Sequence, residues 1–146
     1  MFGVQWDLVL KHLSNKGVSD SLLKNDSTEW GNYKNKTYEI TNTSAKYSTD
    51  NGASFTNAPY NKTASGSVLL TTGAYDNFSK YNIYDLVGNV WEMTLERANY
   101  TEITNIPCAC RGGYLAIQGS DRPASDRGYV YPKNNNYYLG FRCTLY

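Results

Sequence analysis

The feature that most constrains the fold is the stretch from Ser14 to about Lys80, which carries no sustained hydrophobic period. Neither the strict alternation of a half-buried strand nor the helical period of about 3.6 residues continues through it. Asn, Ser, Thr, Gly and Lys dominate this stretch, and they are the residues of turns and loops. We therefore expect irregular backbone with short strands, for which residues 36–41 and 67–72 are the candidates.

Regular patterns flank this stretch. Residues 2–13 place apolar side chains at spacings of three and four, which predicts an amphipathic helix that ends near Gly17. Residues 90–95, 111–115 and 139–145 carry the alternation of strands. Residues 116–138 are expected to form an irregular loop; a loop of this length is usually functional or disordered, and its tyrosines argue against disorder.

Length and charge narrow the class of protein. A chain of 146 residues suits one domain spanning residues 1–146, and the net charge of +1 gives no electrostatic footprint for nucleic acid or an anionic membrane. No apolar run is long enough to span a bilayer, and residues 1–12 lack the pattern of a signal peptide. We expect neither a nucleic-acid partner nor a membrane span.

Polar aromatic residues are abundant. The chain has 14 Tyr and 3 Trp against 4 Phe and 2 Met, and it is rich in Asn. Tyr and Asn combine contact area with adaptable hydrogen bonding, as in antibody paratopes, which favours a binding surface. A loop-rich fold that needs turn-forming residues explains the same composition equally well.

The three cysteines, Cys108, Cys110 and Cys143, define no disulfide framework, because an odd number leaves at least one unpaired within the chain. A Cys-Ala-Cys segment without a second pair of ligands does not predict a zinc site. The sequence still allows one disulfide bond, from Cys108 or Cys110 to Cys143.

Three motifs occur in one order: Ile83-Tyr84-Asp85-Leu86-Val87-Gly88-Asn89-Val90-Trp91-Glu92-Met93, then Arg111-Gly112-Gly113, then Gly140-Phe141-Arg142. Together they resemble the formylglycine-generating enzyme, or sulfatase-modifying factor, family. Gln5-Trp6-Asp7 is similar to a Glu-Trp-Glu helix of that family, although the first half of the usual domain is not recognisable upstream of Phe2. The resemblance implies an α+β fold of the C-type-lectin type, with short twisted antiparallel strands, much irregular loop, and Trp91 and Phe141 in the core.

The family's enzymes oxidise a sulfatase cysteine with a pair of cysteines that follows Arg-Gly-Gly. Residues 114–127 contain no cysteine, and Cys108 and Cys110 precede the triplet. A catalytic thiol must lie within bonding reach of copper or substrate. We therefore expect that the protein has no oxidase activity and is not an enzyme.

The resemblance also implies a calcium site, because family members bind this ion around the Gly-Asn-Val-Trp segment. The matching positions are Asp85, Leu86, Gly88 and Val90, which offer one carboxylate and successive carbonyls for the six to eight oxygens that calcium takes. The alternative is that Asp85 only caps a turn.

The function expected from these observations is a ligand-binding module for a protein or a glycan. Its candidate contact residues are Tyr114, Gln118, Asp121, Arg122, Tyr129, Tyr131, Asn134, Asn135, Asn136 and Tyr137, expected on one exposed face. Phage and bacterial proteins with this type of domain are diversified near the C-terminus by retroelements that mutate Asn-type codons, and residues 134–138 resemble such a region. By that analogy the protein acts at a cell surface or on a virion; the alternatives are an oxidase or related enzyme with displaced cysteines, or a degenerate structural fragment.

Overall fold

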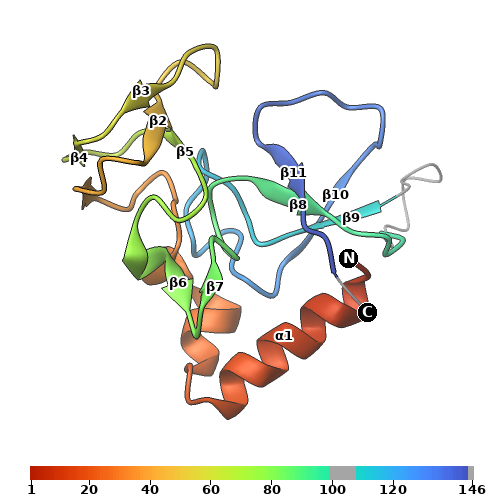
Figure 1. Ribbon diagram of the computed structural model, residues 1–146. Helices are drawn as coiled ribbons and strands as arrows, with labels where there is room; N and C mark the ends of the chain where they lie inside the picture. The colour runs from red at the N-terminus through yellow and green to blue at the C-terminus, as the bar shows by residue number, and fades with distance from the viewer. Residues whose placement is uncertain (99–107, 145–146) are drawn as a thin grey trace.

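The computed structural model describes residues 1–98 and 108–144 (Figure 1). In this part of the chain one long helix is combined with short, mostly antiparallel strands, so the expected α+β class is confirmed. The end of the strand predicted at 139–145 lies outside the described residues.

Helix α1 covers Gly3–Asn15 and confirms the helix predicted at residues 2–13. Its apolar stripe buries Trp6, Leu10 and Leu13. The backbone N–H of Phe2 donates to Oε1 of Gln5 at 2.8 Å, which satisfies one free amide at the start. The helix ends before Gly17, whose φ of +94° lies in the left-handed region that favours glycine.

Short elements fill the stretch without hydrophobic period, as expected. They are η1 (Ser21–Asn25), η2 (Thr28–Trp30), β1 (Tyr38–Ile40), β2 (Lys46–Ser48), β3 (Thr56–Asn57), β4 (Tyr60–Lys62), β5 (Leu69–Leu70), η3 (Asp76–Phe78), β6 (Ser79–Lys80) and β7 (Ile83–Tyr84). Strands β1 and β5 lie inside the two predicted candidates. β1 pairs with β4, β2 pairs with both β3 and β5, and β6 pairs with β7. A core that includes Tyr38, Ile40 and Phe78 joins β1, β5 and η3, whereas Leu23 of η1 and Trp30 of η2 belong to another core.

The largest sheet brings the end of the chain beside its middle. Its strands are β8 (Trp91–Met93), β9 (Cys108–Arg111), β10 (Arg127–Val130) and β11 (Leu139–Phe141), in the order β10-β9-β8-β11. β11 pairs with β8 in parallel, and the other two pairs are antiparallel. Strands at 90–95 and 139–145 are thereby confirmed, although both are shorter than predicted.

The prediction of a strand at 111–115 was wrong. Only Arg111 belongs to a strand, because Gly112 and Gly113 have φ values of +85° and +71° and turn the chain away. A Cβ on Gly112 would lie 2.5 Å from the carbonyl oxygen of Leu86, so this turn approaches another backbone too closely for a side chain.

Two further expectations need correction. Residues 116–138 are not wholly irregular, because β10 lies among them. Phe141 is not in the core: its side chain is 75% exposed, because it stands on an edge strand and on the sheet face that α1 does not cover. Trp91 is only half-buried.

Helix α1 packs through Trp6 and Leu13 against Trp30, Tyr33 and Val87, which form a second core beside the sheet. The indole N–H of Trp6 donates to the carbonyl of Ala124 at 2.9 Å. Among the described helices none combines the length and apolarity that crossing a membrane requires.

Candidate ligand-binding surface

The sheet β10-β9-β8-β11 has two faces with different chemistry, because successive side chains of a strand point to opposite sides. Glu92 and Arg111 share the face that meets α1, where Arg111 pairs with Asp7. Trp91, Met93 and Cys110 belong to the opposite face and pack in one apolar cluster. The two faces therefore separate an ionic, structural side from an aromatic, partly open side.

On the α1 face, ion pairs join the sequence motifs to one another. The guanidinium of Arg142 donates to both carboxylate oxygens of Glu92, at 2.5 and 2.8 Å, and so links β8 to the end of β11. Arg111 is fully buried, lies over the ring of Trp6 and pairs with Asp7 of α1. These contacts give the charged residues of the motifs structural roles.

Asn89 also has a structural role. Its side-chain oxygen accepts from the N–H of Leu70 and its amide donates to the carbonyl of Leu70, both at 3.0 Å. Asn32 donates to the same oxygen and is held in turn by the hydroxyl of Tyr38. This buried amide network ties the chain before β8 to the sheets of the first half.

On the opposite face the rings of Trp91, Tyr114, Tyr137 and Tyr138 form what we call the aromatic cluster. Ring centroids are 4.8 Å apart between Trp91 and Tyr114, 4.7 Å between Tyr114 and Tyr138, and 5.1 Å between Tyr138 and Tyr137. These separations are those of favourable aromatic pairs. The rings come from three separate segments of the chain and meet at one place on the surface.

Two residues set the position of Trp91 in the aromatic cluster. Gly128 of β10 lies against its ring: a Cβ there would come within 2.6 Å of Cζ2 of Trp91. The guanidinium of Arg122 lies 5.7 Å from the centre of the Trp91 ring and also donates to the carboxylate of Asp126. The indole Nε1 of Trp91 is buried without a partner among the described residues, so one donor at this site is unsatisfied.

The predicted contact residues do not all gather here. Tyr114, Arg122 and Tyr137 belong to or adjoin the aromatic cluster, and Tyr131, Asn134, Asn135 and Asn136 lie in the connection from β10 to β11 that leads to Tyr138. Gln118 and Asp121 are exposed in a turn that rests on the chain near Thr28. Tyr129 alternates with Gly128 and therefore points to the face of α1, away from the cluster.

Sequence reasoning missed Tyr138, Gly128 and the role of Trp91 as a surface residue. Gly128 lies in β10, a strand within the range 116–138 for which the sequence predicts an irregular loop.

The proposed calcium positions are mostly buried. Oδ2 of Asp85 accepts from the backbone N–H of Gly73 at 2.7 Å, and the carbonyl of Asp85 accepts from Arg142 at 3.0 Å. Burial raises the pKa of the Asp85 carboxyl. Leu86 and Gly88 are buried beside Gly112 and Asn32, and Val90 is half-buried. The visible role of Asp85 is to cap a turn, which accounts for one of its two oxygens, so these residues alone fit a calcium shell only in part.

The cysteines do not form a reactive pair. All three are free thiols, so the open possibility of a bridge to Cys143 is not realised in this structure. Cys110 is fully buried, and desolvation raises the pKa of its thiol to about 12. Cys108 is buried too and donates to the carbonyl of Val130. In the described part of the chain no three His, Cys, Asp or Glu side chains form a group that could hold a metal ion.

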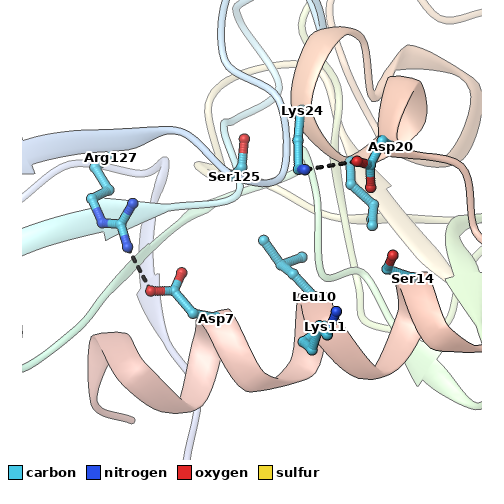
Figure 2. Close-up of a pocket in the computed structure, with 9 residues that line it drawn as sticks. Asp7, Leu10, Lys11, Ser14, Asp20, Lys24, Ser125 and Arg127 are labelled. Atoms are coloured by element: carbon cyan, nitrogen blue, oxygen red, sulfur yellow. Dashed lines mark hydrogen bonds and ion pairs between the residues drawn. The ribbon is translucent and has the colours of Figure 1, made fainter.

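A cleft of about 370 Å³ lies between α1, η1 and the chain before β10 (Figure 2). Arg127 pairs with Asp7 at 2.5 Å on one side, and Lys24 pairs with Asp20 at 2.7 Å on the other. Leu10 and Leu23 are among its apolar lining residues. Both carboxylates of the cleft, Asp7 and Asp20, are already paired with cations.

Fold and surface together define a small α+β protein whose sequence motifs build a scaffold and whose aromatic side chains gather on one face. A comparison with family models finds a match to the sulfatase-modifying factor enzyme 1-like domain over residues 19–145. The chain belongs to this family. The match begins after α1, so the likeness of residues 5–7 to the family's helix stays a prediction. Neither the curated proteins nor the solved structures contain a match.

Proposed function

We propose that this chain is a non-catalytic ligand-binding module with a scaffold of the C-type-lectin type. The aromatic cluster and the connection between β10 and β11 contact the ligand, which is a protein or a glycan. The observation that carries this proposal is the aromatic cluster itself, because side chains from three segments expose part of their rings at one place. Tyr and Trp supply large contact areas at low entropic cost.

The state of the thiols supports a non-catalytic role. The enzymes of this family use cysteines after Arg-Gly-Gly, where this chain has Tyr114 and no cysteine. Cys110 is fully buried and desolvation raises the pKa of its thiol to about 12, whereas nucleophilic cysteines are partly exposed and have a lowered pKa. No observation favours the alternative of an oxidase with displaced cysteines.

The setting we propose is a cell surface or a virion, with the residues before β11 diversified by a retroelement. Asn134, Asn135 and Asn136 lie in the connection that carries Tyr137 and Tyr138, so changes there would alter the ligand surface and leave the sheet intact. An imperfect repeat of the DNA encoding this segment beside a reverse-transcriptase gene tests this part. Its absence from the genomic neighbourhood would end the diversification hypothesis.

The binding role is tested by screening the purified chain against a glycan array and a panel of recombinant surface proteins. A triple variant, Tyr114→Ala/Tyr137→Ala/Tyr138→Ala, should lose at least about 30-fold in affinity for any ligand found, since a central interface Tyr contributes about 2 kcal/mol or more. The matched control is Tyr81→Ala/Tyr84→Ala, which removes exposed tyrosines on β7 and the turn before it. Equal affinities of the triple variant and the wild type, with both folded, would exclude the aromatic cluster as the site.

A further inference from the structure

The cleft between α1 and η1 combines a charged rim with an apolar floor (Figure 2). Leu10 and Leu23 line the floor and belong to the core beneath it. In Figure 2 the side chain of Leu10 points from α1 into the space between the Asp7 and Asp20 ion pairs. The volume of about 370 Å³ lies within the range of small-molecule sites in proteins. The cleft can therefore hold a compact ligand that has one polar and one apolar part.

The arginine end of the cleft is balanced in charge. Oδ1 of Asp7 accepts from the buried Arg111, and Oδ2 accepts from Arg127 at 2.5 Å. Nε of Arg127 also donates to the carboxylate of Glu96 at 2.8 Å. Two arginines are thus paired with two carboxylates, and both oxygens of Asp7 are occupied.

The lysine end of the cleft has a surplus of positive charge. Nζ of Lys24 donates to Oδ2 of Asp20 at 2.7 Å. The charge of Lys11 acts on the same carboxylate, so the pKa of Asp20 is lowered by Lys24 first and by Lys11 to a smaller extent. Both lysines are exposed, and each ammonium has three N–H donors, of which Lys24 uses one for Asp20. Two cations share one carboxylate here, and several of their donors point to no described acceptor.

This distribution of charge selects the sign of a ligand. A cationic ligand would find Asp7 and Asp20 already paired, whereas a monoanion would balance the second lysine and accept hydrogen bonds from both. We propose that the cleft binds a small organic acid, with its carboxylate held by Lys11 and Lys24 and its apolar part on the leucines of the floor. The site is separate from the aromatic cluster, which lies on the face of the sheet that α1 does not cover, so its loss leaves ligand binding by the cluster intact.

The test uses hexanoate and phenylacetate as probes of the full chain, followed by proton–nitrogen correlation NMR. Hexylamine and hexanol at the same concentrations control for charge, and acetate controls for the apolar part. Both acids should shift the amide signals of residues 7–14, 20–24 and 125–127 in a saturable way. Hexylamine and hexanol should leave these signals unchanged, and acetate should bind more weakly than hexanoate because it buries less apolar surface.

A single variant tests the role of the surplus lysine. Lys11→Gln should weaken hexanoate binding about fivefold, roughly the effect of removing one unit charge about 4 Å from the carboxylate in water. Lys16→Gln is the matched control, because Lys16 is an exposed lysine at the end of the same helix that does not line the cleft. Its affinity for hexanoate should equal that of the wild type.

A second measurement needs no variant. Raising the salt concentration to about 1 M, where the Debye length falls to about 3 Å, should weaken hexanoate binding, since the lysine end is exposed. Three results overturn the proposal: no saturable shift with either acid, shifts that hexylamine reproduces, and shifts that map outside the cleft. Hexanoate binding that a folded Lys11→Gln protein retains in full, or that high salt leaves unchanged, also overturns it.

Discussion

The ion pair between Glu92 and Arg142 tests whether the charged residues of the sequence motifs stabilise the sheet that contains β8 and β11. The side chain of Glu92 is 8% exposed and that of Arg142 is 27% exposed, so the two partners do not lose water equally. Burial raises the pKa of Glu92 although Arg142 pairs with it, so the loss of hydration of this carboxylate outweighs the stabilising effect of Arg142 on its charge. Removing Arg142 leaves a buried carboxylate alone, whereas removing Glu92 leaves a guanidinium that still reaches solvent.

We therefore expect unequal costs from two single variants. Arg142→Met should lower the free energy of unfolding at neutral pH by about 3–5 kcal/mol, the range found when one partner of a buried pair is removed. Glu92→Met should cost clearly less. The double variant Glu92→Met/Arg142→Met should be more stable than Arg142→Met, because it removes the unpaired charge and keeps apolar volume.

Denaturation by guanidinium chloride, followed by tryptophan fluorescence, measures all four proteins under one condition. Equal costs of the two single variants would refute the unequal burial on which the argument depends. A double variant whose loss equals the sum of the single losses would show that the two side chains do not interact.

Three further predictions concern single positions. If calcium binds at Asp85, a chelator should lower the melting temperature and Asp85→Ala should abolish that effect; an unchanged melt leaves Asp85 as a turn cap only. Burial lowers the pKa of Lys62 from 10.5 to about 8, so between these values the folded state binds fewer protons than the unfolded chain and the contribution of Lys62 to stability rises with pH. The stability of the wild type relative to Lys62→Met should therefore rise by about 1 kcal/mol per pH unit above 8, and a flat difference contradicts the shift. Gly128→Val should crowd the ring of Trp91, cost about 1–3 kcal/mol on unfolding and weaken ligand binding; unchanged stability would show that the ring has room to move.

The sequence predicted elements whose pattern is local. The apolar stripe of α1 and the alternation around Trp91 and Leu139 identified the helix and two strands of the main sheet. An element that buries one side repeats its apolar residues at the period of its backbone, so the sequence shows it. Residues 111–115 were misassigned because apolar content at Tyr114 and Leu115 resembles a strand. Gly112 and Gly113 instead have positive φ values, and the carbonyls of Leu86 and Arg122, respectively, lie too close to them for a side chain.

The candidate surface was predictable only in part. Tyr114, Arg122 and Tyr137 were expected to face outward from one loop, but the aromatic cluster depends on Trp91 and Tyr138, which β8 and β11 bring together. The sequence contains no signal for a parallel pairing between residues almost fifty positions apart. Tyr129 was expected on the same face as the other candidates, whereas its position in β10 puts it on the opposite side of the sheet from Gly128, and the sequence predicted no strand there.

The parallel pairing of β8 with β11 also has a consequence for biosynthesis. Glu92 leaves the ribosome long before Arg142, and the three strands that precede β11 cannot complete their sheet until the last one is made. Contacts of such sequence separation form slowly, and the incomplete sheet presents an open edge at β8 in the meantime. Folding of this chain is therefore expected to finish after synthesis of residue 142, and a nascent chain stalled before β11 is the species most exposed to aggregation.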